Sequence, residues 1–294
     1  MRDIYKDVTD RLLAAMETAG EWNPPWHGYK GSLPKNGYTK SKYRGINVLM
    51  LWLTSMGEGF TSDTWASYKQ WQLAGRQVKK GAKGTPVVYY GQMFRADQAK
   101  PERDDKRIPF LKTSAVFNEA QLDGYIPPAP PVLLDESLRD DRIDAHVHRV
   151  GVAIRFNAGF NPCYVPALDE IRMPPFGQFK TAPHFYGTQF HELVHWTGAK
   201  NRLNRDLGKR FGKESYAAEE LVAEIGAAFL CAEFGLPSRV REDHAPYVAS
   251  WIKLLKDDKR AIFTAAAKAG DAAGFVVNAG NPELLAVAGD LEAA

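Results

Sequence analysis

One stretch of the sequence constrains fold and chemistry more than any other. It runs His191-Glu192-Leu193-Val194-His195 and has the form HExxH. Residues four apart lie on one face of a helix, so both imidazoles can bind one Zn²⁺ while Glu192 faces a metal-bound water. Thr188 is a candidate N-cap for this helix, and Gly198 stands where the helix should stop. The motif predicts a helix that carries the core of a metallopeptidase site.

Such a site also needs a third protein ligand and an open position for water. Residues 216–230 are predicted to form a second helix with carboxylates along one edge. Glu220 and Glu224 lie one turn apart there, so one can bind the metal while the other orients a ligating histidine. Glu219 is expected to be a solvated neighbour. The alternative for the motif, a surface helix with two solvated histidines, is disfavoured by this second, carboxylate-bearing helix.

Positive charge and aromatic residues are concentrated in the front part of the chain. Residues 1–100 contain 15 Lys and Arg against 8 Asp and Glu, whereas the whole chain has a net charge of only +3. The same region holds five of the seven tryptophans and seven of the twelve tyrosines. Aromatic planes for base stacking, interleaved with cations that follow phosphate, are typical of single-stranded DNA binding with little sequence preference.

The candidate DNA contacts are aromatic and basic residues beside predicted turns. Their alternatives are packing in the core for the aromatic rings and a solvated turn for the lysines. Trp52 lies within an apolar segment and is expected in the core. The predicted contacts are Trp22, Trp26, Lys40, Lys42, Tyr43, Arg44, Lys79, Lys80 and Lys83.

Hydrophobic periodicity and turn residues predict the elements on either side of a proline-rich stretch. In front of it we expect helices at 3–19, 46–56 and 64–74, a loop or hairpin at 34–45, and strands at 87–90 and 113–117. Behind it we expect a helix near 135–148, strands at 150–156 and 163–166, the two helices of the metal site, and helices near 244–256 and 258–269. Clustered prolines at 126–131 favour an extended linker. The predicted domains are 1–125 and 138–294, joined by a linker at 126–137.

The residues of the metal site resemble a known family. HELVHWTG at 191–198 followed by YAAEELVAEIGAAFL at 216–230 resembles the zincin-like domain of ArdC-type antirestriction proteins, which conjugative plasmids carry. More distantly the segment resembles the glutamate zincins, whose third ligand begins an E-x-x-x-D or E-x-x-A-N pattern. That resemblance implies Glu220 as the ligand and Glu224 behind it, although Glu224 stands where Asp or Asn is usual.

The front of the chain resembles the same family in the order of its motifs. A leading helix is followed by tryptophans around a proline pair, Asn36 with the run at 43–47, the segment at 65–70, and glycines and lysines at 75–84. The resemblance therefore covers essentially the whole chain. It implies an α+β fold with two domains, a small mixed α/β domain that binds single-stranded DNA followed by a zincin-like metallopeptidase domain.

The resemblance implies an antirestriction protein that protects incoming plasmid DNA during conjugation. We expect one divalent metal bound by His191, His195 and Glu220, with Zn²⁺ as the default and Mn²⁺ or another transition metal suited to the same donors. Glu192 is the predicted catalytic base. Two alternatives use the same ligands: a protection factor with a structural or vestigial metal site and no proteolysis, and a peptidase-type regulator that cleaves a DNA-bound repressor. The protein substrate is unknown.

The remaining features exclude other classes. No uninterrupted apolar run reaches the roughly 18 residues that a bilayer span needs, and the first residues lack the apolar segment of a signal peptide. We therefore expect a cytoplasmic protein without a membrane partner. The only cysteines, Cys163 and Cys231, are expected to be buried thiols and are too few for a cysteine-based zinc site.

Overall fold

The computed structural model describes residues 3–18, 32–95, 106–127, 138–237 and 245–281. Contacts divide the chain into two units, each with helices and strands, which confirms the predicted α+β class. We call Pro34–Pro128 the sheet unit, and Met1–Leu33 with Ala129–Ala294 the helical unit. Trp22 and Trp26, two of the predicted DNA contacts, lie outside the described residues.

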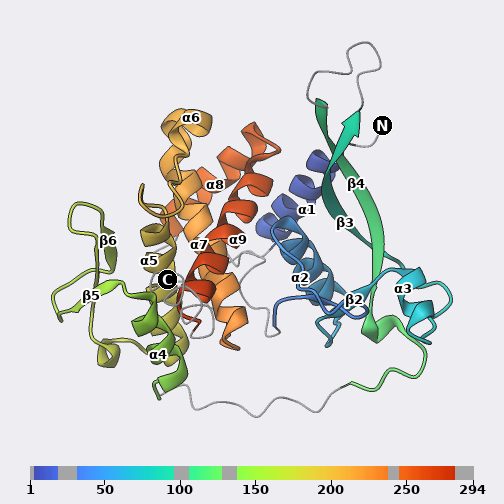
Figure 1. The fold of residues 1–294 in the computed structure, drawn as a ribbon, viewed down its shortest axis with the longest axis horizontal. Coiled ribbons are helices and arrows are strands. Elements are labelled where there is room, and N and C mark those ends of the chain that lie inside the picture. Colours follow the sequence, from blue (N-terminus) through green and yellow to red (C-terminus); the bar gives the residue numbers. More distant parts are fainter. Residues whose placement is uncertain (1–2, 19–31, 96–105, 128–137, 238–244, 282–294) are drawn as a thin grey trace, which may run out of the picture. The chain divides into compact units, whose positions relative to one another are not determined.

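The sheet unit is built on a four-stranded sheet in the order β1-β2-β4-β3. Its strands are β1 (Lys35–Asn36), β2 (Thr64–Ala66), β3 (Thr85–Arg95) and β4 (Lys106–Asn118). The last two form a long antiparallel ribbon, which curves away from the rest of the unit in Figure 1. The unit also contains helices α2 (Ile46–Glu58) and α3 (Tyr68–Leu73) and the short 3₁₀ turn η1 (Glu119–Gln121).

The segment predicted as one helix at 64–74 is in fact a strand followed by a helix. Trp65 pairs with Asn118 in the sheet, and the helix α3 begins only after Ser67. The Ser67 hydroxyl accepts a hydrogen bond from the backbone N–H of Gln70, and the Gln70 side chain accepts one from the Ser67 N–H. This reciprocal capping box fixes the start of the helix. The prediction was wrong here because the segment has helical periodicity throughout, and Ser67 was not identified as an N-cap within it.

The tryptophans of the sheet unit form its core. Trp52, Trp65 and Trp71 are 1%, 0% and 3% exposed. Trp65 packs with Leu51, and Trp71 donates its indole N–H to the Phe117 carbonyl at 3.0 Å. Trp52 was expected in the core, and none of these three rings can serve as a platform for a base.

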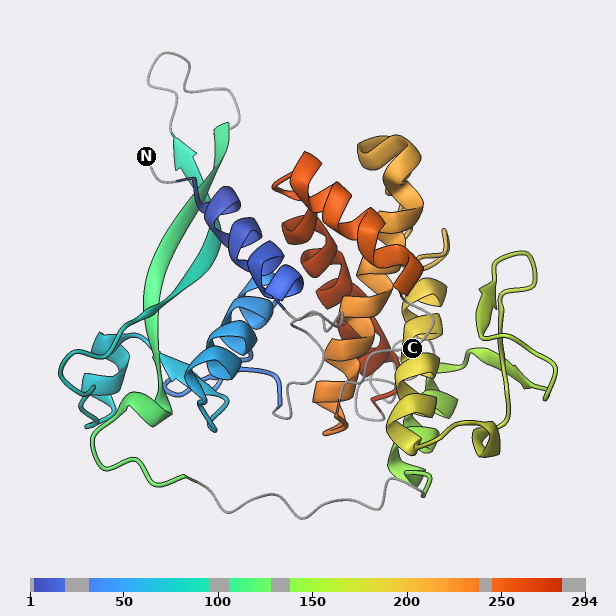
Figure 2. The ribbon, with the colours of Figure 1, turned by 180° about the vertical axis from the view of Figure 1, so that it is seen from behind.

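The helical unit combines helices with a three-stranded sheet, as Figures 1 and 2 show from two sides. Its helices are α1 (Ile4–Thr18), α4 (Asp141–Val150), α5 (Ala182–Thr197), α6 (Gly208–Phe211), α7 (Ser215–Glu233), α8 (Ala245–Asp257) and α9 (Ala261–Ala279). The sheet has the order β5-β7-β6, with strands β5 (Ala153–Phe156), β6 (Cys163–Val165) and β7 (Glu170–Met173). Two 3₁₀ turns, η2 (Phe176–Gln178) and η3 (Gly212–Glu214), complete the unit.

The predicted domain limits differ from this division at the beginning of the chain. The helix α1 has its contacts in the helical unit, since the ring of Tyr5 packs edge-on against Phe263 at 4.7 Å. The Thr9 hydroxyl also donates to the Lys259 carbonyl at 2.9 Å. Sequence periodicity predicted an apolar face for α1 but not the partner against which that face packs. Within the described segments, no helix is both long and apolar enough to cross a membrane.

The helices α5 and α7 approach closely and carry the HExxH motif and the glutamates. The helix α5 begins earlier than predicted, because Thr181 rather than Thr188 is its N-cap, and Thr188 is buried within the helix. The approach to α7 is close at Gly226, where an added Cβ would lie only 2.7 Å from Val194 Cγ2. Only glycine leaves room for this contact. The absence of a side chain at Gly226 therefore lets α5 and α7 lie near enough for their side chains to bind one ion.

We therefore expect Gly226→Ala to destabilise the metal-free protein. Overpacking of a core contact costs about 1–3 kcal/mol, which outweighs the gain in helix propensity of alanine over glycine. The matched control is Gly274→Ala in α9, where an added Cβ has nothing within 4 Å. It should stabilise the protein by about 0.5–1 kcal/mol. Urea unfolding of both variants checks the signs, and equal midpoints would contradict the close packing.

Candidate metal centre

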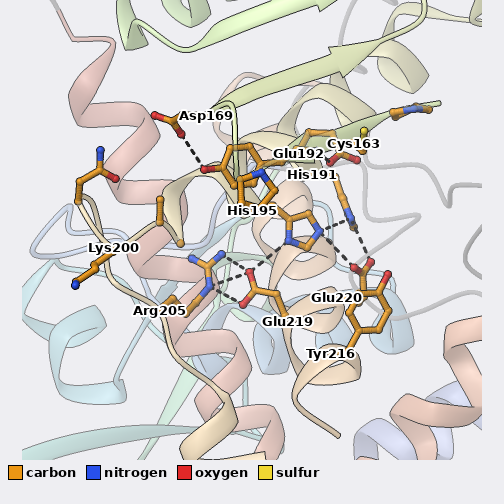
Figure 3. Close-up of a pocket in the computed structure, with 16 residues that line it drawn as sticks. Cys163, Asp169, His191, Glu192, His195, Lys200, Arg205, Tyr216, Glu219 and Glu220 are labelled. Atoms are coloured by element: carbon orange, nitrogen blue, oxygen red, sulfur yellow. Dashed lines mark hydrogen bonds and ion pairs between the residues drawn. The ribbon is translucent and has the colours of Figure 1, made fainter. Parts of the chain in front are cut away.

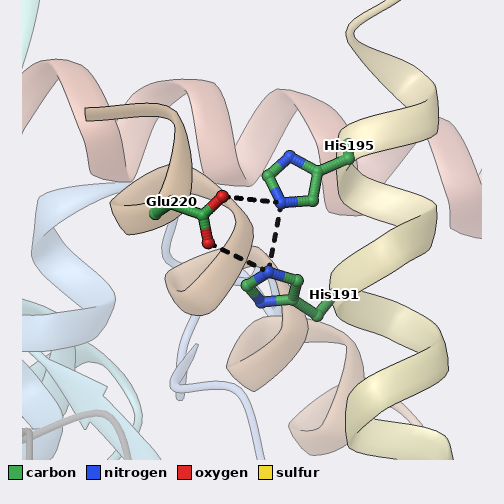
Figure 4. Close-up of side chains that lie close together, drawn as sticks. All are labelled: His191, His195 and Glu220. Carbon is green, nitrogen blue, oxygen red and sulfur yellow. Dashed lines mark hydrogen bonds and ion pairs between the residues drawn. The ribbon is translucent and has the colours of Figure 1, made fainter. Parts of the chain in front are cut away.

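Three side chains from the two packed helices converge on one point (Figure 4). His191 and His195 lie one turn apart on α5, and their Nε2 atoms are 3.1 Å apart. Glu220 on α7 faces both rings, with carboxylate oxygens 3.5 Å from each Nε2. The packing of α5 against α7 therefore brings together the three residues that were predicted as metal ligands, and their donor atoms face a common centre.

The spacing of these donors fits a tetrahedral ion. Nitrogen and oxygen ligands about 2.0–2.2 Å from zinc lie about 3.3–3.6 Å from one another in a tetrahedron. The two nitrogen–oxygen separations of 3.5 Å fall within this range, and the nitrogen–nitrogen separation of 3.1 Å lies slightly below it. The same geometry leaves the fourth position without a protein ligand among the described residues.

The electrostatics of the site also suit a cation. Four carboxyl groups, those of Glu192, Glu219, Glu220 and Glu224, gather around the two histidines, against one guanidinium, that of Arg205. Burial raises the pKa of Glu220, but the two imidazoles and the Tyr216 hydroxyl outweigh this effect and lower it. Glu220 is therefore ionised at neutral pH, the form in which a carboxylate binds a metal. A divalent cation offsets the excess negative charge of this buried cluster.

Each histidine also has a carboxylate on the side away from the cluster. Glu224 Oε2 lies 3.3 Å from His191 Nδ1, and Glu219 Oε1 lies 3.3 Å from His195 Nδ1. Glu224 thus occupies the place behind a ligand that the family resemblance implied. The expectation for Glu219 was wrong: its side chain is 26% exposed and faces His195 and Arg205 rather than solvent.

Arg205 holds Glu219 in this position. Its Nε donates to Glu219 Oε2 at 2.8 Å, and its Nη2 donates to the Val194 carbonyl at 2.7 Å. Burial raises the pKa of Glu219, but hydrogen bonds from Arg205 and His195 outweigh it and lower that pKa to about 2. The carboxylate is therefore charged across the physiological range and accepts hydrogen bonds from both partners.

Glu192, the predicted base, is oriented by the edge strand of the small sheet. Its Oε2 accepts a hydrogen bond from the backbone N–H of Tyr164 on β6 at 2.8 Å, and its side chain is buried. That bond uses one carboxylate oxygen and fixes the plane of the group. A base needs such an orientation to accept a proton from a water beside the histidines.

A second arginine secures β6 itself. Arg202 Nη1 donates to Asp169 Oδ2 at 2.9 Å, and the Tyr164 hydroxyl donates to Asp169 Oδ1 at 2.8 Å. The Arg202 guanidinium lies over the Trp196 ring at 3.9 Å and donates through Nε to the Trp196 carbonyl at 2.6 Å. The turn between β6 and β7 is thereby tied to the end of α5, so the strand that orients Glu192 is anchored to the helix that carries it.

A pocket of about 1120 Å³ opens onto the cluster, and Figure 3 shows the side chains that line it. Its walls include Cys163 and Tyr164 from β6 and Tyr216 from the start of α7. Cys163 is exposed and only Cys231 is buried, so the expectation of two buried thiols was wrong for Cys163, although both are free. The volume is sufficient for several residues of an extended chain.

The described DNA-contact candidates lie in the sheet unit, and their environments differ. All six cations (Lys40, Lys42, Arg44, Lys79, Lys80 and Lys83) are exposed. Tyr43 instead packs against the core cluster that contains Trp65, and its hydroxyl lies 3.3 Å from Asn36 Nδ2. The exposed rings of the same unit include those of Tyr38 and Tyr68, at 48% and 43% exposure. Sequence reasoning missed both of these, although each tyrosine stands close to a lysine.

Other residues of the metal centre also escaped prediction. The strand β7 was not predicted. The hydrogen bond from Tyr164 to Glu192 could not be predicted either, because no sequence pattern links residues 28 positions apart. Arg205 left none either. Glu219 did leave one, since a carboxylate directly before a metal ligand on a helix lies about 100° around the axis and can reach the neighbouring histidine.

Comparison with known proteins identifies both parts of the chain. A family profile described as the N-terminal domain of anti-restriction factor ArdC matches residues 2–117. A profile described as a zincin-like metallopeptidase matches residues 141–268, which include the whole metal centre. The rear match agrees with the predicted zincin-like domain.

Solved structures and curated relatives extend the match over nearly the full length. The crystal structure of the antirestriction ArdC protein from plasmid R388, metal-free, is 40% identical with a TM-score of 0.83, covering 95% of this chain and 98% of that one. Its Mn(II)-bound form is also 40% identical, with a TM-score of 0.79, covering 96% and 99%. The uncharacterized protein y4eC of Sinorhizobium fredii (strain NBRC 101917 / NGR234) is 41% identical over 91% of this chain and 89% of its own length. A DNA primase TraC of Escherichia coli is 36% identical over 94% of this chain but only 27% of the primase.

The geometry predicts different effects for substitutions of Glu220 and Glu224. We expect Glu220→Ala to lose most affinity for Zn²⁺ and Mn²⁺, because it removes a ligand, and Glu224→Ala to lose about 10–100-fold, because it frees a ligating ring. Titration of each metal against a chromogenic chelator at fixed pH measures both. Normal binding by Glu220→Ala together with failed binding by Glu224→Ala would make Glu224 the third ligand instead.

Proposed function

This chain belongs to the ArdC family of antirestriction proteins, and we propose that it protects incoming plasmid DNA during conjugation by two activities. The sheet unit binds single-stranded DNA, and the metal centre hydrolyses peptide bonds of a protein substrate. The metal is one divalent ion held by His191, His195 and Glu220, with Zn²⁺ as the default and Mn²⁺ suited to the same donors.

One observation carries the peptidase proposal. The three ligands and the oriented Glu192 line an open pocket of about 1120 Å³. Structural zinc sites are closed by four protein ligands, whereas catalytic sites have three and leave a position for water or substrate. The open pocket therefore favours a catalytic centre over the alternative of a structural one.

The residues of the pocket have separable tasks in this chemistry. A divalent ion, when bound, supplies Lewis acidity toward a peptide carbonyl and a water molecule. Glu192 accepts the proton of the attacking water through the carboxylate oxygen that Tyr164 does not occupy, and then donates it to the leaving amine. His191 and His195 remain neutral and are held by Glu224 and Glu219.

Charge and exposed aromatic rings support DNA binding by the sheet unit. Lys79, Lys80 and Lys83 lie in the exposed turn between α3 and β3. The Asn36 side chain connects the turn that carries Tyr38 to α3, which begins with Tyr68, through a 3.2 Å hydrogen bond to Gln70. Cations that follow the backbone and rings that stack on bases are what a single strand requires. The similarity to part of a DNA primase is consistent with a function on DNA.

We predict that Glu192→Gln retains the metal but loses protection. The amide oxygen can still accept the Tyr164 N–H, so the site should stay folded, while the loss of the base should slow hydrolysis by about 10²–10⁴-fold. The measurement is the transfer efficiency of a conjugative plasmid into restricting and non-restricting recipients, with metal content determined on the purified variant. Full protection by a metal-loaded Glu192→Gln would instead support a DNA-binding protection factor without proteolysis.

The two contributions to DNA binding can be separated by salt. Replacing Lys79, Lys80 and Lys83 with alanine should flatten the slope of log affinity against log salt by about 2, at roughly 0.7 per phosphate contact. Replacing Tyr38 or Tyr68 with alanine should weaken binding by about 1–3 kcal/mol and leave the slope unchanged. Tyr125→Ala, at a half-buried ring of the same unit, is the matched control. An unchanged slope in the triple variant would place the phosphate path on Lys40, Lys42 and Arg44.

A further inference from the structure

The two ligating histidines differ in how firmly their own helix confines them. His191 lies within α5 and its side chain is only 4% exposed, so surrounding atoms fix the ring. His195 lies two residues before the end of the helix at Thr197, and its side chain is 17% exposed. A ring at a helix end with one side open keeps rotational freedom, which a metal site must remove by some other contact.

That contact is made by Glu219, which is itself held by Arg205. The Arg205 side chain is 1% exposed, and besides Glu219 it bonds the Val194 carbonyl at 2.7 Å and the Thr197 hydroxyl at 3.1 Å. Both of these acceptors belong to the last turn of α5, the turn that carries His195. Glu219 is therefore fixed relative to the histidine it faces, and the 3.3 Å contact to Nδ1 is set by the fold rather than by a free rotamer.

Gly198 gives independent support for this arrangement. Its φ of −72° and ψ of −13° are open to any residue, so backbone conformation does not require glycine there. An added Cβ would lie 2.8 Å from Arg205 Nη2, however, and the guanidinium cannot swing aside without giving up its bonds. The glycine after HELVHWT thus provides space for the arginine beneath the end of the helix.

We propose that Arg205 and Glu219 are positioning residues of the metal centre. Arg205 fixes the Glu219 carboxylate, Glu219 accepts the Nδ1–H of His195, and the imidazole is held in the tautomer and orientation that turn its Nε2 lone pair toward the ion. Glu224 Oε2 lies in the corresponding place beside His191, 3.3 Å from its Nδ1. This inference rests on the proposed metal centre and extends it, because Glu219 becomes part of the machinery instead of a neighbour of the third ligand.

The competing explanation is a staple that only joins α5 to α7. A staple would contribute to stability without influencing how tightly a folded protein binds metal. The experiment therefore measures Zn²⁺ and Co²⁺ affinities of the full chain at fixed pH, well below the unfolding temperature, and records the visible spectrum of bound Co²⁺. The variants are Glu219→Gln, Arg205→Lys and Gly198→Ala. The control is Glu214→Gln, which breaks an exposed ion pair with Lys253 just before α7.

We expect Glu219→Gln to weaken both metals by about 10–100-fold and to shift the Co²⁺ spectrum, because the ligand ring loses its anchor. Arg205→Lys and Gly198→Ala, which leave the Glu219 side chain in place, should weaken binding less, and the control should stay within about twofold. If Glu219→Gln fails to fold, the affinities of Arg205→Lys and Gly198→Ala decide the question.

If the folded variants bind both metals with wild-type affinity and show the wild-type Co²⁺ spectrum, the proposal is overturned, even where their thermal stability is lower. Arg205 and Glu219 would then only join α5 to α7. Failure of the wild-type chain to take up either metal would be a different result, since it would refute the metal centre itself. Affinity is the readout in every arm, so the test does not depend on identifying the protein substrate.

Discussion

The contact between α5 and α7 at Gly226 is the constraint on which the metal centre depends. An α-helix places residues four apart on one face, but a tetrahedral ion also requires donors from a second element a few ångströms away. Val194 lies between the two histidines in the sequence and packs where Gly226 has no side chain. The closeness of the backbones therefore allows a short side chain, Glu220, to complete a site begun by His191 and His195.

The helix α7 carries the ligand Glu220 and the carboxylates of Glu219 and Glu224 that face the two histidines. Negative charge is therefore concentrated in the interior of the helical unit. Burying ions is costly unless each is paired. Arg205 compensates Glu219, whereas the carboxylates of Glu220 and Glu224 face imidazole rings at 3.5 and 3.3 Å. A divalent ion removes the remaining imbalance, so binding of metal and stability of the helical unit are linked.

The sequence predicted the part of this site that follows from local periodicity. HExxH and the i, i+4 glutamates determine which side chains share a helix face, and three of them meet as expected. The roles of Arg205 and Tyr164 depend on how separate elements are placed, which no local pattern encodes, whereas Glu219 left a local signal in its position directly before Glu220. The same distinction explains the fold: α2 was predicted almost to its ends, whereas β2 was mistaken for helix because its role becomes visible only when Trp65 pairs with Asn118. Tyr43 has cations as sequence neighbours and core residues as spatial neighbours, which is the alternative that the sequence left open for its ring.

A single asparagine side chain forms hydrogen bonds with the outer edge of the four-stranded sheet. Strand β3 is the last in the order β1-β2-β4-β3, so one of its edges has no neighbouring strand in the described sheet. Asn47 from α2 donates through Nδ2 to the Val88 carbonyl at 2.8 Å and accepts the Val88 N–H through Oδ1 at 2.7 Å. Its side-chain amide thus takes the place of a neighbouring peptide group. Exposed Tyr89 and Tyr90 follow directly, a composition that favours pairing between molecules at an open edge. Because Asn47 occupies both backbone groups of Val88, a strand from another molecule cannot form its hydrogen bonds with the β3 edge at that residue.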